Sequence, residues 1–281
     1  GKTEGNTLLG FAGSLNDVGL LNRLKGEPRI AETYLREALR QSENLVGNER
    51  AVLAIVLGHL AMARDEQGDP VTAEQLVRQS IKEYRRLPGN QRAETGGSLV
   101  NLGIILKDRG EYAEAEANIN EGLEIYRQLL GEAHPFTALA LNHLSDLQLS
   151  KGDYPTAEEN ARKSLEIAKR TLPEKHPTLA YPLTSLGMIL TRRDQPQAGE
   201  KYLREAMEIR NRVMDKNFWR VAETEGALGE CLKAQRKFAD AEPFLRDSYE
   251  KLVVSQGTAN SRTVWVKHLL DELYRKWRRS A

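Results

Sequence analysis

The sequence repeats with a period of 42 residues, and this period restricts the chain to a stack of similar units. Turn glycines recur at Gly26, Gly68, Gly110 and Gly152. Small residues follow five positions later in every unit, at Ala31, Ala73, Ala115, Ala157, Gly199 and Ala241. A fixed period of this length is typical of a solenoid, in which each unit buries its apolar face against its neighbours.

The register divides most of the chain into six units without an insertion. We expect an N-terminal tail at residues 1–7 and a C-terminal capping helix at residues 260–281. The units between them are 8–49, 50–91, 92–133, 134–175, 176–217 and 218–259.

Each unit predicts two helices joined by a turn. In the fourth unit, Leu141, Leu144 and Leu147 recur at helical spacing, Gly152 marks a turn, and a second amphipathic pattern begins near Ala157. Ala, Leu, Glu, Arg and Lys, which favour helix, are abundant. The small residues allow two helices to approach closely. We therefore predict an all-α fold of thirteen helices without a sheet.

The motifs of these units resemble those of the tetratricopeptide repeat family. A small residue, Leu and Gly occur in the first helix, and the turn glycine precedes an aromatic residue or proline. The closing sequence Leu130-Gly131-Glu132-Ala133-His134-Pro135 resembles the long 42-residue variety found in kinesin light chains and bacterial signalling proteins. The resemblance implies a right-handed superhelical solenoid whose first helices line a concave groove. Asp194 and Arg236 replace the turn glycine in the last two units, which leaves the register there to be tested.

Charge and composition argue against several classes of function. Lys and Arg total 41 against 40 for Asp and Glu, so the one-sign field that attracts nucleic acid or anionic membranes is absent. Cys231 is the single cysteine, which excludes an intramolecular disulfide and a multi-cysteine metal site. The most apolar stretch, residues 51–63, is too short to cross a bilayer. Gly1 is preceded by no Met and followed by no leader, so we expect a piece of a longer protein, and the single cysteine fits the reducing conditions of the cytoplasm.

No motif predicts catalysis, a cofactor or a metal site. Nothing resembles a nucleophile elbow or a kinase signature. The pair Glu158 and Glu159 stands at helical spacing from Arg162 and Lys163, which favours ion pairs on a solvated face. Cys231 fits a buried position better than a reactive one. We therefore expect a protein that is not an enzyme.

The first helices carry the candidate partner-binding residues. Their columns mix glycines, apolar residues and amides, and asparagines could pair with the backbone of an extended peptide, although Asn also suits a solvated helix face. The predicted groove residues are Asn16, Ile55, His59, Met62, Asn101, Ile104, Lys107, Asn142, His143, Asp146, Tyr181 and Met188.

Two functions remain open from the sequence. The first is a protein- or peptide-binding scaffold, as the interaction arm of a larger signalling protein. The alternative is a receptor for a small molecule or signalling peptide, coupled to an effector such as a kinase or ATPase. The basic C-terminal helix is a second candidate surface, and the oligomeric state is undetermined. Its cationic residues are Arg262, Lys267, Arg275, Lys276, Arg278 and Arg279.

Overall fold

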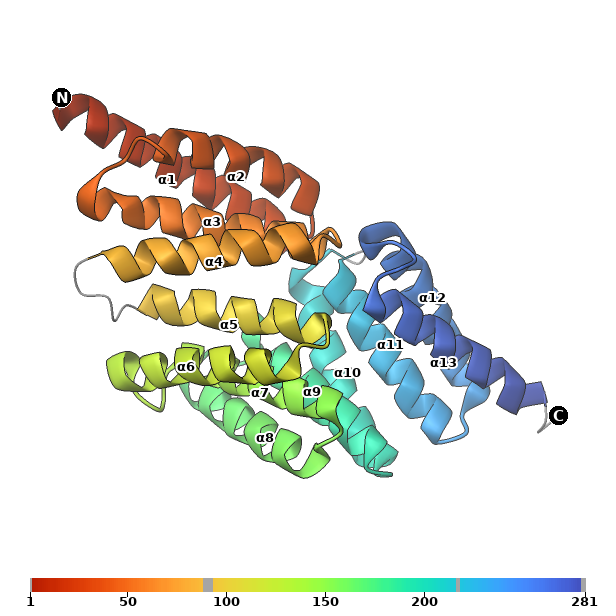
Figure 1. Cartoon of the computed structure of the whole chain (residues 1–281). Helices are drawn as coiled ribbons and strands as arrows, with labels where there is room; N and C mark the ends of the chain where they lie inside the picture. The colour runs from red at the N-terminus through yellow and green to blue at the C-terminus, as the bar shows by residue number, and fades with distance from the viewer. Residues whose placement is uncertain (1, 88–92, 216–217, 279–281) are drawn as a thin grey trace. The chain divides into compact units, whose positions relative to one another are not determined.

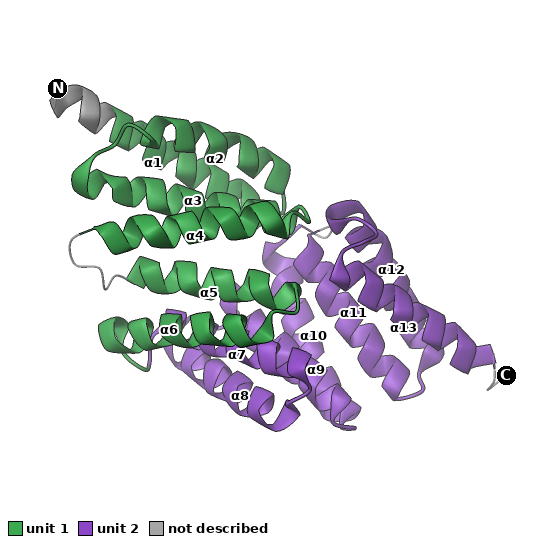
Figure 2. Cartoon of the chain, in the orientation of Figure 1, with its two compact units in different colours: residues 1–132 green, residues 133–281 purple. Residues whose placement is uncertain are grey.

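The computed structural model describes residues 2–87, 93–215 and 218–278, and these residues form thirteen α-helices and no strand (Figure 1). The chain divides into two compact units, the first unit of residues 1–132 and the second unit of residues 133–281 (Figure 2). The six 42-residue units of the sequence are called repeats from here on. The predicted all-α repeat architecture is confirmed.

Within each unit the helices alternate between two kinds, which we call A helices and B helices. The A helices are α1 (Lys2–Lys25), α3 (Arg50–Glu66), α5 (Ala93–Asp108), α7 (Pro135–Lys151), α9 (Ala180–Arg192), α11 (Trp219–Ala234) and α13 (Ser261–Arg278). The B helices are α2 (Pro28–Ser42), α4 (Pro70–Arg86), α6 (Tyr112–Leu130), α8 (Tyr154–Thr171), α10 (Pro196–Val213) and α12 (Phe238–Gln256). Short 3-10 turns, Gly47–Glu49 and Pro177–Leu179, precede α3 and α9.

The first helix begins earlier than the repeat pattern suggests. Residues 2–7, expected as a separate tail, form the first turns of α1. No proline or turn motif separates them from Leu8, so nothing in the sequence interrupts the helix there.

Small residues bring each A helix close to the B helix of its own repeat. A Cβ added at Gly122 on α6 would lie 2.6 Å from the carbonyl oxygen of Gly96 on α5. At the position of Gly122, the fourth and sixth repeats carry serines, and these hydroxyls donate across the same crossing. Ser164 Oγ donates to the Ala138 carbonyl at 2.6 Å, and Ser248 Oγ donates to the Ala222 carbonyl at 2.6 Å. The predicted reason for the small columns is therefore confirmed.

The turn between the two helices of a repeat needs a left-handed residue. Gly26, Gly68, Gly110 and Gly152 have φ between 80° and 90°. Asp194 and Arg236 adopt the same conformation, with φ of 59° and 63°. The 42-residue register therefore continues through the last two repeats, although the glycine is replaced there.

Two histidines that precede prolines cap helix starts. His134 Nδ1 accepts from the Phe136 N–H at 3.1 Å, and His176 Nδ1 accepts from the Thr178 N–H at 3.2 Å. On the outer surface of the second unit, Arg162 Nη2 lies 2.6 Å from Glu158 Oε1. Lys163 Nζ lies 2.6 Å from Glu159 Oε1, so both predicted ion pairs form.

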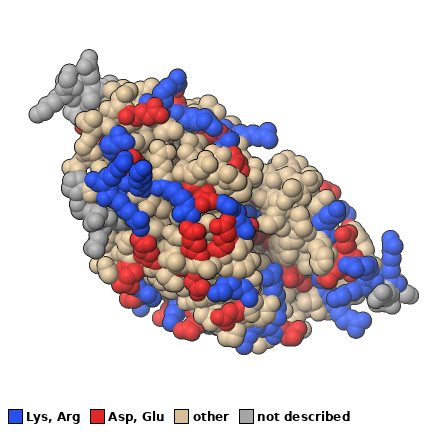
Figure 3. All heavy atoms as spheres, in the orientation of Figure 1, with Lys and Arg blue, Asp and Glu red and all other residues tan. Residues whose placement is uncertain are grey.

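The surface mixes charges of both signs, and the face drawn in Figure 3 shows basic side chains gathered over α4. Across the part of the chain that the structure describes, no helix has the length and apolarity needed to span a bilayer.

Candidate functional site

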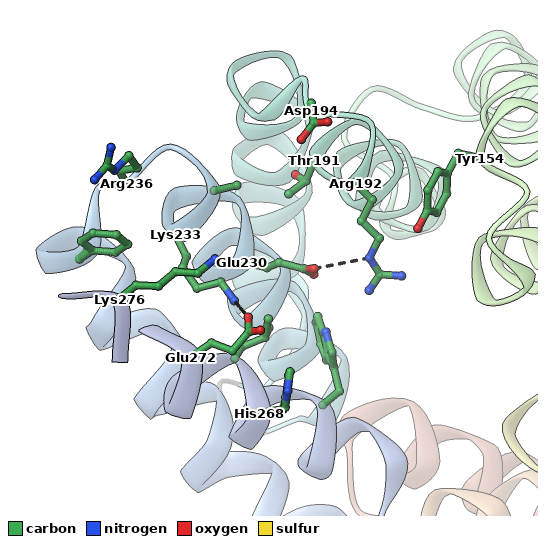
Figure 4. Close-up of a pocket in the computed structure, with 14 residues that line it drawn as sticks. Tyr154, Thr191, Arg192, Asp194, Glu230, Lys233, Arg236, His268, Glu272 and Lys276 are labelled. Atoms are coloured by element: carbon green, nitrogen blue, oxygen red, sulfur yellow. Dashed lines mark hydrogen bonds and ion pairs between the residues drawn. The ribbon is translucent and has the colours of Figure 1, made fainter. Parts of the chain in front are cut away.

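The second unit contains a cavity of about 810 Å³ at the C-terminal ends of its A helices. Figure 4 shows side chains from α9, α11 and α13 around it, with Tyr154 of α8 nearby. Its walls combine apolar side chains with charged groups of both signs. The lining residues are Tyr154, Thr191, Arg192, Asp194, Glu230, Lys233, Ala234, Arg236, Phe238, Trp265, His268, Leu269, Glu272 and Lys276.

Two ion pairs cross the cavity wall. Arg192 of α9 reaches Glu230 of α11 at 3.4 Å, and Lys233 Nζ lies 2.5 Å from Glu272 Oε2 on α13 (Figure 4). The hydrogen bond from Lys233 lowers the pKa of Glu272 and holds it ionised. Lys233 is buried, so this pair lies in a region of reduced solvent screening.

Two polar atoms of the cavity residues are buried without a partner among the described residues. They are Glu230 Oε2, an acceptor, and the indole Nε1 of Trp265, a donor. A buried polar atom without a hydrogen bond costs about 1–3 kcal/mol. A ligand that donates to Glu230 and accepts from Trp265 would recover this free energy.

Aromatic rings and guanidinium groups stack on the same A-helix face, toward the N-terminal ends of α9, α11 and α13. The guanidinium of Arg220 lies over the rings of both Tyr181 and Trp219, at 4.9 and 4.2 Å from their centroids. Arg262 of α13 also lies over Trp219, at 4.5 Å, and its Nε is 3.4 Å from Glu223. These contacts hold the side chains in fixed orientations.

A buried arginine supports this face from the B-helix layer. Arg210 of α10 is 1% exposed. It donates to the Thr224 hydroxyl and to the carbonyl oxygen of Arg220, and it lies 3.9 Å from Glu223. Burial lowers the pKa of Arg210, and the negative charge of Glu223 opposes that effect. The same side chain fixes the backbone that carries Arg220.

The predicted residues of the second unit form a hydrogen-bonded group beside these arginines. Asn142 Nδ2 donates to Asp146 at 3.2 Å, and Ser185 Oγ donates to Asp146 at 2.5 Å. His143 packs edge-on against Tyr181, with ring centroids 6.5 Å apart. Met188 is half-buried and packs against the core.

In the first unit the structure joins Asn16 to His59 of the next A helix, with Asn16 Oδ1 2.8 Å from His59 Nδ1. Burial, together with the positive charge of Arg23, lowers the pKa of His59 to about 4. Lys107 lies 2.9 Å from Asp108. Five of the predicted residues here are half-buried: Ile55, His59, Asn101, Ile104 and Lys107.

Three of the predicted groove residues are not open on the surface. Asn16, Met62 and Asn142 are buried. The expectation that they present free amides or exposed apolar groups is corrected, because successive A helices pack side by side and cover one another's side chains. Asn16 and Asn142 form hydrogen bonds with other side chains of the protein: Asn16 with Asp17 and His59, and Asn142 with Asp146 and Ser185.

Sequence reasoning missed most residues of the cavity. Glu230 and Glu272 occupy the position of Met188 in the two A helices that follow, 42 and 84 residues further along the chain. Lys233 follows Glu230 by one helical turn. The repeat position shared by Met188, Glu230 and Glu272 therefore lies on the A-helix face that carries the cavity. The ion pairs depend on side chains from three helices.

The C-terminal helix contributes to the same face. Arg262 and Lys276, assigned to a separate basic surface, lie at the Trp219 ring and in the cavity wall. Neighbouring side chains of α13, including Val266 and Leu273, are buried in the core of the second unit. Arg279 lies outside the described residues. Elsewhere in the described chain, no three His, Cys, Asp or Glu side chains are grouped as a metal site.

Comparison with known families matches a tetratricopeptide repeat model to residues 11–86 and 94–170, and a second tetratricopeptide repeat model to residues 183–219. The chain belongs to the tetratricopeptide repeat family. No curated protein matches the sequence.

Solved structures share the fold at low sequence identity. BtubC from P. vanneervenii is 20% identical, with a TM-score of 0.58 over 83% of this chain and 91% of that one. Repeats of a putative kinesin light chain from Podosopora anserina are 16% identical, with a TM-score of 0.53 over 73% and 97%. The Rap conjugation regulator of plasmid pLS20, solved with the Phr* peptide, is 13% identical, with a TM-score of 0.64 over 93% and 74%.

Proposed function

We propose that this chain is a non-catalytic binding protein that holds a peptide segment of a partner against its A helices. The cavity of the second unit carries the proposal, because it combines apolar walls with an unpartnered buried donor and acceptor. Membership of the tetratricopeptide repeat family and a structural neighbour solved with a peptide support it.

A peptide suits the cavity for chemical reasons. Its backbone N–H can donate to Glu230 Oε2, and its carbonyl oxygen can accept from the Trp265 indole. Phe238 and Leu269 provide apolar contact for one side chain, and the arginines near Trp219 stand beside the next stretch of the chain. In the first unit, Ile55, His59, Asn101, Ile104 and Lys107 remain the predicted contacts.

The proposal also includes a place in a larger protein. A binding module without chemistry of its own acts by recruiting a partner or by passing a binding event to an attached domain. We propose the first of these, as the interaction arm of a cytoplasmic signalling protein.

A peptide array tests the function. Arrayed twelve-residue peptides are probed with the tagged chain, and the dissociation constants of the hits are measured by fluorescence anisotropy. Glu230→Gln should weaken the hits about tenfold to a hundredfold, because a hydrogen bond to a buried charged group contributes about 1.5–3 kcal/mol. Trp265→Phe, which keeps an aromatic ring and loses the N–H, should weaken them about threefold to tenfold.

Matched controls isolate the cavity. Trp277→Phe and Glu242→Gln change the same residue types outside the cavity lining and should leave binding unchanged. An array without hits would reject the proposed site. Hits whose dissociation constants are unchanged in Glu230→Gln and Trp265→Phe would reject it as well.

A receptor for a small polar molecule is the second candidate. The cavity volume of about 810 Å³ favours it, since small-molecule sites commonly occupy about 300–1,000 Å³. Thermal shift with a metabolite library distinguishes a small-molecule receptor from a peptide-binding protein. A small molecule that binds the cavity should raise the melting temperature of wild type but not of Glu230→Gln.

A further inference from the structure

Two arginines, which we call the arginine pair, occupy the same repeat position in the last two A helices. Arg220 of α11 and Arg262 of α13 are 42 residues apart in the sequence. Both guanidinium groups lie over the indole of Trp219, at 4.2 and 4.5 Å from the ring centroid. The pair is specific to these two helices, because no lysine or arginine occupies the equivalent position of the five earlier A helices. The residues there are Gly10, Val52, Glu94, Phe136 and Thr178.

The arginines of this region outnumber the carboxylates beside them. Glu223 lies 3.4 Å from Arg262 and 3.9 Å from buried Arg210, so two guanidinium groups share one carboxylate. Within the described part of the chain, Arg220 forms no ion pair. The positive charge of Arg220 adds to the effect of burial in lowering the pKa of Arg210. With Asp146 also counted near Arg210, one positive charge is left for an anion to compensate.

Hydrogen-bond donors are available at the same place. Arg220 is half-buried, and its guanidinium lies over Tyr181 and Trp219, which leaves the N–H groups in its plane to bind an acceptor. Trp219 is 6% exposed, and its indole Nε1 has no hydrogen-bond partner among the described residues. A carboxylate matches the fork of an arginine with two parallel hydrogen bonds. Because stacking already orients Arg220, binding costs little further side-chain entropy.

The arginine pair and the cavity lie along the same helices. Trp265, whose side chain lines the cavity, follows Arg262 by about one helical turn on α13. On α11, Arg220 precedes Glu230 by ten residues, which corresponds to a rise of about 15 Å. An extended peptide spans this distance with four to five residues at about 3.3 Å each.

We propose that Arg220, with Arg262 and Trp219, binds the carboxylate of an aspartate or glutamate side chain in the partner peptide. The acidic residue lies four to five residues from the anchor residue, which is the peptide residue that occupies the cavity. This spacing rests on the proposed function, whereas the carboxylate site itself depends only on the arginine pair. The ligand class is therefore an acidic peptide rather than a neutral or basic one.

Solution NMR of the whole chain tests the carboxylate site without any hit from the peptide array. The probes are two capped peptides of five residues, both glycine with a central residue that is glutamate in one and glutamine in the other. The glutamate peptide should shift the indole N–H signal of Trp219, identified with Trp219→Phe, and the glutamine peptide should not shift it at the same concentration. Equal shifts from the two peptides would overturn the proposal.

Variants then assign the site to Arg220. Arg220→Gln should weaken the glutamate peptide about tenfold, because it removes the charged hydrogen bonds. Arg220→Lys, which keeps the charge and loses the fork, should weaken it about threefold. Arg246→Gln is the matched control, since Arg246 is an exposed arginine of α12, and it should leave the affinity unchanged. Unchanged affinity in Arg220→Gln would overturn the assignment, and circular dichroism checks that each variant is folded.

Substitution series of the array hits test the spacing. The anchor is the peptide residue whose replacement loses its effect in Glu230→Gln. Exchange of aspartate or glutamate for its amide, four to five residues from the anchor, should weaken binding about tenfold in wild type and not in Arg220→Gln. Hits that depend on Glu230 but on no acidic residue at this distance would overturn the spacing and leave the proposed function intact. An array without hits would reject the proposed function and the spacing together, and the five-residue peptides would still test the carboxylate site.

Discussion

Arg236 occupies a left-handed position, with φ of 63°, in the turn between α11 and α12. This conformation raises the energy of a residue with a Cβ by about 1–2 kcal/mol, whereas glycine adopts it freely. Arg236→Gly should therefore raise the free energy of unfolding by about 0.5–1 kcal/mol, after the entropy that glycine adds to the unfolded chain.

Urea unfolding followed by circular dichroism measures this change. Gly152→Ala, at φ of 80° in the equivalent turn of the fourth repeat, provides the reverse control and should lower the free energy of unfolding by about 1 kcal/mol. A loss of stability in Arg236→Gly would mean that the arginine side chain stabilises this turn more than the backbone opposes it.

His59 makes the stability of the first unit depend on pH. Its pKa in the folded protein is about 4, lowered mainly by burial, against about 6.5 in the unfolded chain. The unfolded chain therefore binds the proton first, and stability falls as pH drops from 7 toward 4. By pH 5 the loss should be about 1–2 kcal/mol.

His59→Gln, which can still donate to Asn16, should remove this loss. The exposed residue His268 supplies the control, because His268→Gln should keep the pH dependence of wild type. Parallel pH profiles for wild type and His59→Gln would show that another group is responsible.

At the scale of the helix pair, two glycines in A helices have opposite roles. A Cβ at Gly103 would collide with Ile119 and lie 2.9 Å from the Ala115 carbonyl oxygen, whereas nothing lies within 4 Å of a Cβ at Gly13. Gly103→Ala should lower the free energy of unfolding by about 1–3 kcal/mol through overpacking. Gly13→Ala should raise it by about 0.5–1 kcal/mol through helix propensity. Thermal unfolding of the two variants checks both signs, and a gain in both would contradict the close crossing.

The element scale is also where the sequence was most informative. The columns of Ala31 and Gly26 predicted where helices touch and where they turn, because each depends on contacts within one repeat. Arg210 could not be found in this way. The equivalent positions of the other repeats hold Ser42, Tyr84, Tyr126, Ala168 and Leu252, which carry no charge, and only the fold shows that a buried arginine here lies beside Glu223.

At the scale of the molecule, the sequence predicted the class of fold but only part of the site. Glu230 and Glu272, which stand at the positions equivalent to Met188, line the cavity of the second unit. The cavity itself arises where Arg192, Lys233 and Glu272 from three separate helices meet, and periodicity does not report which side chains pair across helices. Asn16 and Asn142 were placed on the right helices but were expected to be open, because burial depends on the neighbouring repeat.

Hydrogen–deuterium exchange with and without the tightest peptide from the array tests the central claim most directly. Bound peptide should slow exchange in α9, α11 and α13, at residues 180–192, 219–234 and 261–278, and the Glu230→Gln variant should lose this protection at the same peptide concentration. Protection confined to the B helices α8, α10 and α12 would contradict binding at the A-helix cavity.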